Sequence, residues 1–196
     1  MWTVMTEALE LLTAAAATVT PDRRDAPTPC TDWTVTQVLQ HAAGDQVAWA
    51  AALGTGTGPD ENPFDPSGKA DGPLAKLVAP AIATVQSAWA SVTDADESVP
   101  TPLPQGQLPA ATAAAACALD AAVHAWDVLT ALGVAAGLTP ELAAQLLPAA
   151  REIVEPLRQY GVYATALAPE PDDDATAELL RYLGRDPNWR PAFQVR

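Results

Sequence analysis

Three side chains that could bind a metal ion lie close together inside an otherwise apolar segment. Asp120, His124 and Asp127 belong to a run from 109 to 132 that consists mainly of Ala, Leu, Val and Cys. On a helix, at about 100° per residue, these three positions share one side of the cylinder. Because an uncompensated buried charge costs several kcal/mol, such a polar stripe needs a partner. A divalent cation held by carboxylate and imidazole groups from more than one helix would supply it.

The other histidine of the chain, His41, lies on a second segment with helical spacing. Asp45 follows it by one turn, from where it could orient the imidazole through its second nitrogen. A lone helical histidine is more often a hydrogen-bonded core or surface residue than a ligand. A carboxylate and an imidazole four residues apart, as at Asp120 and His124, can nevertheless clasp one ion from the same face. From spacing alone, a metal site and a purely structural role for these histidines are equally supported.

The elements that must position these residues are helices. Apolar side chains recur at helical spacing in six segments, which predicts helices over 5–19, 35–53, 74–92, 109–132, 139–160 and 176–183. Thr34 and Thr139 are the expected N-caps, and Gly133 is expected to end the longest helix. Segment 54–73 is rich in Gly, Pro and Asp and is expected to be a loop that covers the mouth of a site. Segment 94–108 is expected to be a Pro-rich connection, in which 100–108 is extended at most.

Length and charge limit the function classes. The 196 residues suit one domain, so we expect a single metal-binding helical-bundle domain over 1–196. A formal net charge of −14 would repel a polyanion, which argues against nucleic acid as a partner. No cationic leader or bilayer-length apolar run is evident, so we expect a cytoplasmic protein with no membrane contact. The expected partner is a small-molecule substrate, and the apolar excess would also suit a homodimer.

Three short motifs resemble those of a known family. Residues 28–41 contain TPCTDWTV and then VLQH, and residues 123–133 contain VHAWDVL and then ALG. These runs are similar to the two signatures of actinobacterial proteins with a maleylpyruvate isomerase-like N-terminal domain, which belong to the DinB-like superfamily of metal-binding four-helix bundles. The closing run LGRDPNW, at 183–189, resembles the tail of a small metal-binding branch of that group.

The resemblance implies an all-α, DinB-like four-helix bundle with long crossover loops and extra C-terminal helices. It also implies one divalent ion held by His41, Asp120 and His124, with zinc expected first and nickel, iron or manganese also suited to these donors. The typical mycothiol-dependent isomerase of the family has Glu at the place of Asp120 and an additional C-terminal domain that this length does not accommodate. Its substrate is therefore not carried over, and mycothiol as a cosubstrate follows from the resemblance alone.

Four further residues are candidates for roles around the site. Asp127 has two open roles, an acceptor behind the metal ligands or an ion-pair partner for an arginine near the end of the bundle. Trp126 is expected in the core or in the substrate pocket, whose floor we expect from the alanine-rich faces of the second and fourth helices. Cys30 and Cys117 are expected to be packed, unpaired thiols, and their roles stay open.

Three protein ligands would leave a tetrahedral ion with an open position, as in catalytic zinc sites. The first hypothesis is a metal-dependent transferase or isomerase in which a metal-activated thiol, of the mycothiol type, or water attacks a small electrophile. A non-catalytic metal-binding or ligand-sensing bundle is an alternative from another class. A metal-dependent hydrolase is the third hypothesis, and the sequence places no Glu clearly as a general base that would separate the three.

Overall fold

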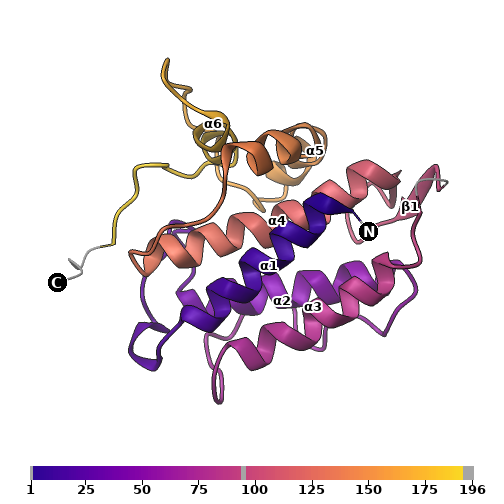
Figure 1. Cartoon of the computed structure of the whole chain (residues 1–196), viewed down its shortest axis with the longest axis horizontal. Coiled ribbons are helices and arrows are strands. Elements are labelled where there is room, and N and C mark those ends of the chain that lie inside the picture. Colours follow the sequence, from indigo (N-terminus) through magenta and orange to yellow (C-terminus); the bar gives the residue numbers. More distant parts are fainter. Residues whose placement is uncertain (1, 94–95, 192–196) are drawn as a thin grey trace.

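The computed structural model describes residues 2–93 and 96–191. Four long helices form the main body, α1 (Thr3–Thr18), α2 (Val35–Ala52), α3 (Ala75–Trp89) and α4 (Ala110–Ala131) (Figure 1). Each contacts two of the others, in the ring order α1, α4, α2, α3. The prediction of an all-α four-helix bundle is therefore confirmed.

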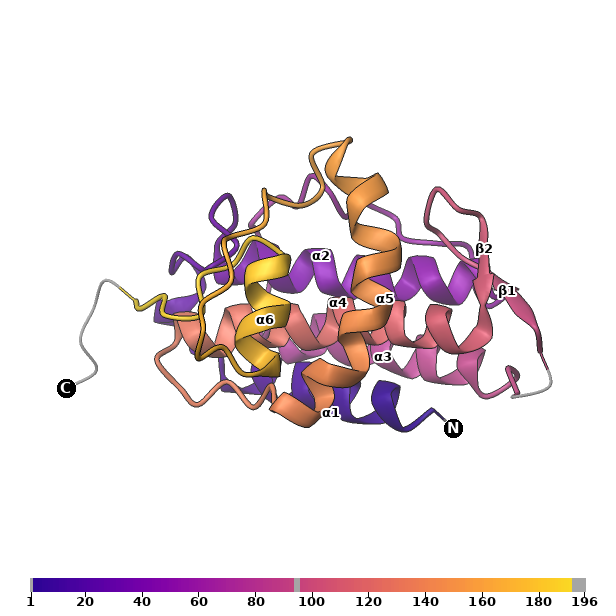
Figure 2. The ribbon, with the colours of Figure 1, turned by 90° about the horizontal axis from the view of Figure 1, so that it is seen from above.

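Two further helices cover one side of this bundle. Helix α5 (Pro140–Arg158) packs on α4, and α6 (Ala175–Tyr182) packs on α5 (Figure 2). A short 3-10 turn, η1 (Pro21–Arg23), follows α1. Helix α4 is thus enclosed by α1, α2 and α5, and it buries side chains around almost its whole circumference. Any polar side chain in its middle is consequently forced into the interior.

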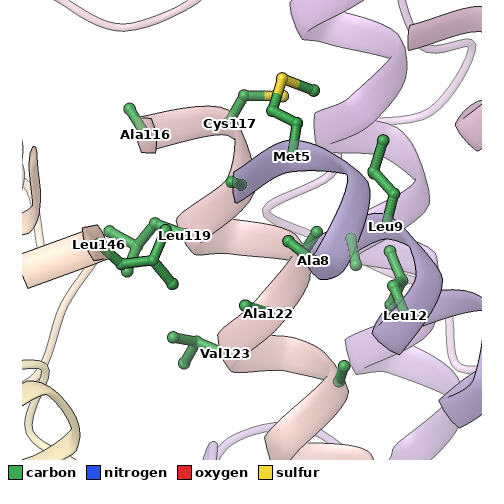
Figure 3. Close-up of a cluster of buried hydrophobic side chains, with 14 of the residues drawn as sticks. Met5, Ala8, Leu9, Leu12, Ala116, Cys117, Leu119, Ala122, Val123 and Leu146 are labelled. Atoms are coloured by element: carbon green, nitrogen blue, oxygen red, sulfur yellow. The ribbon is translucent and has the colours of Figure 1, made fainter. Parts of the chain in front are cut away.

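Small side chains explain how closely α1 and α4 pack. Ala8 of α1 and Ala122 of α4 are both fully buried, and larger residues such as Leu9 and Leu12 fill the space beside them (Figure 3). Alanine has the highest helix propensity and lets two helix backbones approach each other, so an alanine-rich α4 serves both purposes. The alanines of α4 are therefore mainly packing residues between helices.

The start of α2 is fixed by its own sequence. Thr34 accepts a hydrogen bond from the backbone N–H of Gln37, whose side chain accepts one from the backbone N–H of Thr34 at 3.0 Å. This capping box satisfies two backbone donors that the first turn leaves unpaired. Thr139 caps α5 in the same way, through the N–H of Leu142 at 3.1 Å. Both predicted N-caps are confirmed.

The connections between helices were predicted less well. Segment 54–73 has no regular secondary structure, as predicted, and it is held to α2 through Gln40, which binds the backbone of Gly68 and Lys69. Two short antiparallel strands lie in and beside the part expected to be extended at most, β1 (Ser98–Pro100) and β2 (Gln107–Pro109). Strands are extended backbone, so that expectation holds, but their pairing, with Val99 and Leu108 opposite each other and both buried, was not predicted. Residues 94 and 95 lie outside the described part.

No helix among residues 2–93 and 96–191 combines the length and the apolar character needed to span a bilayer. The assignment of 1–196 to a single domain stays a prediction.

Candidate metal centre

The bundle brings the three predicted metal ligands to one point. His41 comes from α2, and Asp120 and His124 come from successive turns of α4. The Nε2 atoms of the two imidazoles lie 3.2 Å (His41) and 3.4 Å (His124) from Oδ2 of Asp120. The candidate ligand atoms of all three residues lie within 4.8 Å of one another. Their use as metal ligands stays a prediction, but their convergence is a feature of the fold.

Hydrogen bonds fix which nitrogen of each imidazole faces the cluster. Nδ1 of His41 lies 2.9 Å from the carbonyl oxygen of Pro63, and Nδ1 of His124 lies 3.0 Å from Oδ2 of Asp127. Both partners only accept hydrogen bonds, so each Nδ1 carries a proton and donates it. In the neutral imidazole, the lone pair then sits on Nε2 and points at the cluster. Two such lone pairs meet the Asp120 carboxylate, and three acceptors without a proton repel one another.

A chain of contacts extends from His124 to the C-terminal segment. The Asp127 carboxylate is completely buried and accepts hydrogen bonds from Nε (2.9 and 3.1 Å) and Nη2 (2.9 Å) of Arg185. The two roles left open for Asp127 are therefore both filled, because it accepts from His124 and pairs with an arginine. A carboxylate behind a metal-ligating histidine holds the ring in one tautomer and orientation.

The charges of His124 and Asp120 depend on each other. Burial alone would lower the pKa of His124, but the carboxylates of Asp120 and Asp127 outweigh it and raise this pKa to about 9. Burial alone would raise the pKa of Asp120, yet the imidazoles of His124 and His41 hold it well below its usual value. Without a cation, a proton on His124 therefore separates the converging acceptors.

The cluster meets the requirements of a divalent cation. Two nitrogens and one carboxylate are donors that zinc and its neighbours accept, and ligands of a tetrahedral zinc ion are about 3.4 Å apart. The separations of Oδ2 from the two Nε2 atoms match this spacing. Oδ1 of Asp120 is buried and has no hydrogen-bond partner among the described residues, as expected of a group that awaits another ligand. The short arm of Asp120 is no obstacle, since its carboxylate already reaches both imidazoles.

A cavity of about 570 Å³ opens beside the cluster and includes His41, Asp120 and His124 in its wall. The loop 54–73 contributes Phe64, whose ring lies 5.3 Å from that of His41, so the prediction that this loop reaches the site holds. The expected alanine-lined floor is wrong: Ala116 is the one alanine of α2 or α4 among the lining residues. Much of the wall comes instead from segments 29–33, 157–164 and 183–185.

The remaining sequence candidates fall in different places. Asp45 lines the cavity, but the Pro63 carbonyl, and not Asp45, orients His41. Trp126 is buried in the core, which was one of its two expected places. It lines a separate cavity with Leu138 and Arg181, and not the one beside the metal ligands. The reason is its direction from α4, toward the side that α6 covers.

The two cysteines are unpaired, as predicted. Cys30 lines the cavity, and burial together with the charge of Asp127 raises its pKa to about 12, so it stays a thiol at neutral pH. Cys117 is fully buried and its Sγ donates to Oε1 of Gln46 at 3.3 Å. Burial raises the pKa of Cys117 well above its usual value, which makes it a packing residue.

Sequence reasoning missed several residues that complete the site. The ring of Trp33 lies against that of His41, tilted by 38° with centroids 4.6 Å apart, and Tyr163 and Arg185 line the same cavity. Trp33 lies within the TPCTDWTV motif and Arg185 within LGRDPNW, so both motifs marked them without indicating a role. Tyr163 follows α5 in a segment without periodicity, where no sequence signal was available.

A bundle of four long helices with a His–Asp–His cluster between α2 and α4 defines a DinB-like protein. The family described as the mycothiol maleylpyruvate isomerase N-terminal domain matches residues 5–129, and the chain belongs to this family. Two uncharacterized proteins of Mycobacterium tuberculosis, from strains H37Rv and CDC 1551, are each 32% identical over 183 residues, which cover 91% of this chain and 93% of theirs. No solved structure matches the chain significantly.

Zinc affinity is expected to rise with pH. Below a pKa of about 9, a proton occupies the His124 imidazole and must leave before Nε2 can bind a cation. The apparent association constant should therefore increase by up to about tenfold per pH unit between pH 6.5 and 9. Competition with a chromophoric chelator, corrected for the chelator's own protonation, measures this slope, and a flat profile would contradict the assigned cluster.

The stability of the metal-free protein should change in the opposite direction. The folded-state pKa of His124 lies above its unfolded value of 6.5, so its charge stabilises the fold fully below pH 6.5. That contribution is lost as the pH rises through about 9. Urea unfolding at pH 7 and pH 9.5 should show a lower free energy of unfolding at the higher pH for metal-free protein, and a smaller decrease for zinc-loaded protein.

Proposed function

We propose that this chain is a metal-dependent enzyme that joins a low-molecular-weight thiol to a small electrophile, or isomerises the electrophile through such an adduct. The observation that carries the proposal is the convergence of three acceptor atoms, from His41, Asp120 and His124, on the wall of a cavity. These residues would hold a divalent cation, zinc first and nickel, iron or manganese as other fits to the donors. When bound, such a cation lowers the pKa of a thiol or water at its open position.

The surrounding residues have supporting roles. Asp127 and the carbonyl of Pro63 keep the two imidazoles in the tautomer that presents Nε2. Trp33 and Phe64 cover the ring of His41 and exclude water from that side. A volume of about 570 Å³ lies within the range of ligand pockets and leaves room for a thiol together with a second reactant.

The family's description supports a thiol as one reactant, because it refers to mycothiol. Mycothiol itself as the cosubstrate, and a cytoplasmic location, are parts of the proposal. The proposal does not depend on whether the protein forms a homodimer, and it does not specify the electrophile. The hydrolytic and non-catalytic alternatives share the same ligands and differ in whether a thiol binds at the cation.

Thiol binding can be tested with a cobalt- or nickel-loaded protein. The full-length, untagged chain is loaded with the metal and titrated with N-acetylcysteine, and N-acetylserine serves as the matched ligand without sulfur. We expect a sulfur-to-metal charge-transfer band in the near-ultraviolet that saturates with the thiol and is absent with the serine analogue.

Two variants make the result specific. Cys30→Ser removes the one thiol of the chain that lines the cavity and should keep the band, which shows that the added thiol is its source. His124→Ala should abolish it. A metal spectrum that stays unchanged when the thiol is added would overturn the thiol-transfer proposal and favour hydrolysis or a non-catalytic role.

A further inference from the structure

The cavity beside the cluster has a second polar region, formed by the C-terminal segment. Arg185 is the one Lys or Arg among the described residues that line the cavity. It is buried, and its approach to the cavity is made by the turn at Gly184, which has φ +80°. A side chain at position 184 would also collide with Ala164, at 2.8 Å between the added Cβ and the Cβ of Ala164. Glycine at position 184 therefore lets the chain before Arg185 pack closely against Ala164, and both Arg185 and segment 157–164 line the cavity.

One part of the Arg185 guanidinium is not used by the protein. Nε and Nη2 bind the Asp127 carboxylate. Nη1 forms no hydrogen bond to any residue in the described part of the chain, and it is not one of the fully enclosed polar atoms. A guanidinium offers five N–H donors in one plane, and a carboxylate is the group that best matches two neighbouring donors. The free edge of Arg185 thus offers a place for an anion at the cavity wall.

Two neutral donors line the cavity with Arg185. Burial and the negative charge of Asp120 raise the pKa of Tyr163 above its usual value, so its hydroxyl keeps its proton at neutral pH. The Cys30 thiol also stays protonated, as described above. A phenolic hydroxyl beside a guanidinium can donate to the same anion. The lining also holds the carboxyl groups of Asp32, Asp45 and Asp120, and burial raises the pKa of Asp45 well above its usual value. The imidazole of His124, which carries a proton in metal-free protein, lies there too, but it already pairs with Asp120 and Asp127.

The mouth of the cavity is apolar. Phe64, Tyr160 and Val162 line it and are 55%, 73% and 38% exposed, which makes them three of the large apolar side chains that the protein leaves in water. Phe64 comes from the loop between α2 and α3, whereas the other two follow α5. Exposed apolar side chains gathered around a concave site are typical of a ligand-binding surface.

We infer that the cavity binds an organic monocarboxylate with an apolar body, whose carboxylate lies on Nη1 of Arg185 and whose body packs on Phe64, Tyr160 and Val162. The electrophile of the proposed function would then be one that carries such a carboxylate beside its reactive carbon, and this inference about the reaction rests on the proposed function. The binding itself does not. A dicarboxylate is disfavoured because Arg185 is the one Lys or Arg in the described lining and the His124 imidazolium of metal-free protein already pairs with Asp120 and Asp127. The carboxylate of Asp120 would also repel a second anion.

Ligand pairs on the unmodified chain test this inference. The probes are 3-phenylpropionate, its neutral analogue 3-phenylpropionamide, and the dianion benzylsuccinate. Binding is followed by tryptophan fluorescence, since Trp33 and Trp49 line the cavity, and by calorimetry. Both zinc-loaded and chelator-treated full-length protein are used. We expect the carboxylate to bind at least about tenfold more tightly than the amide in both preparations, and benzylsuccinate to bind no more tightly than phenylpropionate without zinc.

Two variants assign the preference to residues. Arg185→Lys keeps a positive charge beside Asp127 but removes the N–H donors of Nη1 that would bind the ligand's carboxylate. The preference for the acid over the amide should therefore fall below about threefold, while the amide binds as before. Tyr163→Phe should reduce acid binding by several-fold without changing amide binding. Circular dichroism and melting curves verify folding, and if Arg185→Lys does not fold, Tyr163→Phe and the unmodified chain carry the test.

The outcomes separate this inference from the proposed function. Equal binding of acid and amide in both preparations overturns the carboxylate site. A preference that appears only with zinc also overturns it, because the acid then lies on the cation, and the proposed function stands. Tighter binding of benzylsuccinate in chelator-treated protein overturns the restriction to monocarboxylates. An acid preference in both preparations, lost in Arg185→Lys, supports the inference even if no thiol-dependent metal band is found.

Discussion

Zinc affinity should fall at least about 100-fold, or ~2.7 kcal/mol, when His124 is replaced by alanine. The substitution removes one of three converging donors and also leaves Asp127 without the imidazole that it orients. Loss of a residue behind a metal ligand usually costs 10-fold to 100-fold in affinity, and loss of a ligand should cost at least as much. Competition with a chromophoric chelator at pH 7.5, on protein expressed without an affinity tag, measures the change.

Two further variants serve as controls, one with an intermediate expected loss of zinc affinity and one with none. Asp127→Asn keeps the three ligands but weakens the support of His124, so it should lose about 10-fold in affinity. Asp173→Asn removes an acid that pairs with Arg181, away from the cluster, and should bind zinc like the unmodified chain. If His124→Ala binds zinc within about twofold of the unmodified chain, the cluster is not the metal site and the proposed enzyme has no basis.

The helices and the convergence of the site followed from local pattern. Apolar spacing predicted the six helices with starts within two residues of those observed, because amphipathic periodicity is a property of each segment alone. Asp120 and His124 are four residues apart on one helix and had to share a face. Their meeting with His41 required that α2 and α4 be neighbours, and the family resemblance supplied that fact.

The surroundings of the site could not be predicted because they come from aperiodic segments. The acceptor for His41 is a backbone carbonyl, at Pro63, and any residue in a loop has one to offer. Asp127 was expected to meet some arginine, but the choice of Arg185, 58 positions along the chain, depends on how the tail folds back over α4. The floor of the cavity was wrongly assigned to alanines because the alanines of α4 are buried in the contacts between helices.

Replacing Arg185 by methionine should lower the free energy of unfolding by about 3–5 kcal/mol at pH 7. Asp127 is completely buried, and the burial that would raise its pKa is outweighed in the intact protein first by the charge of Arg185. Without that cation the carboxylate is a buried charge with one partner left. Urea unfolding followed by circular dichroism measures the change, and the double variant Asp127→Asn with Arg185→Met should recover a large part of it.

The pH dependence distinguishes this charge effect from lost packing. In the intact protein the folded-state pKa of Asp127 is depressed, so its contribution is present above the unfolded value of about 4 and is lost only at lower pH. In Arg185→Met the same pKa rises, and protonation of Asp127 relieves the buried charge as the pH falls. The stability difference between the two proteins should therefore narrow from pH 7 to pH 5. A difference that stays constant over this range would mean that Arg185 acts through its aliphatic packing, and the electrostatic link between the C-terminal segment and α4 would have to be abandoned.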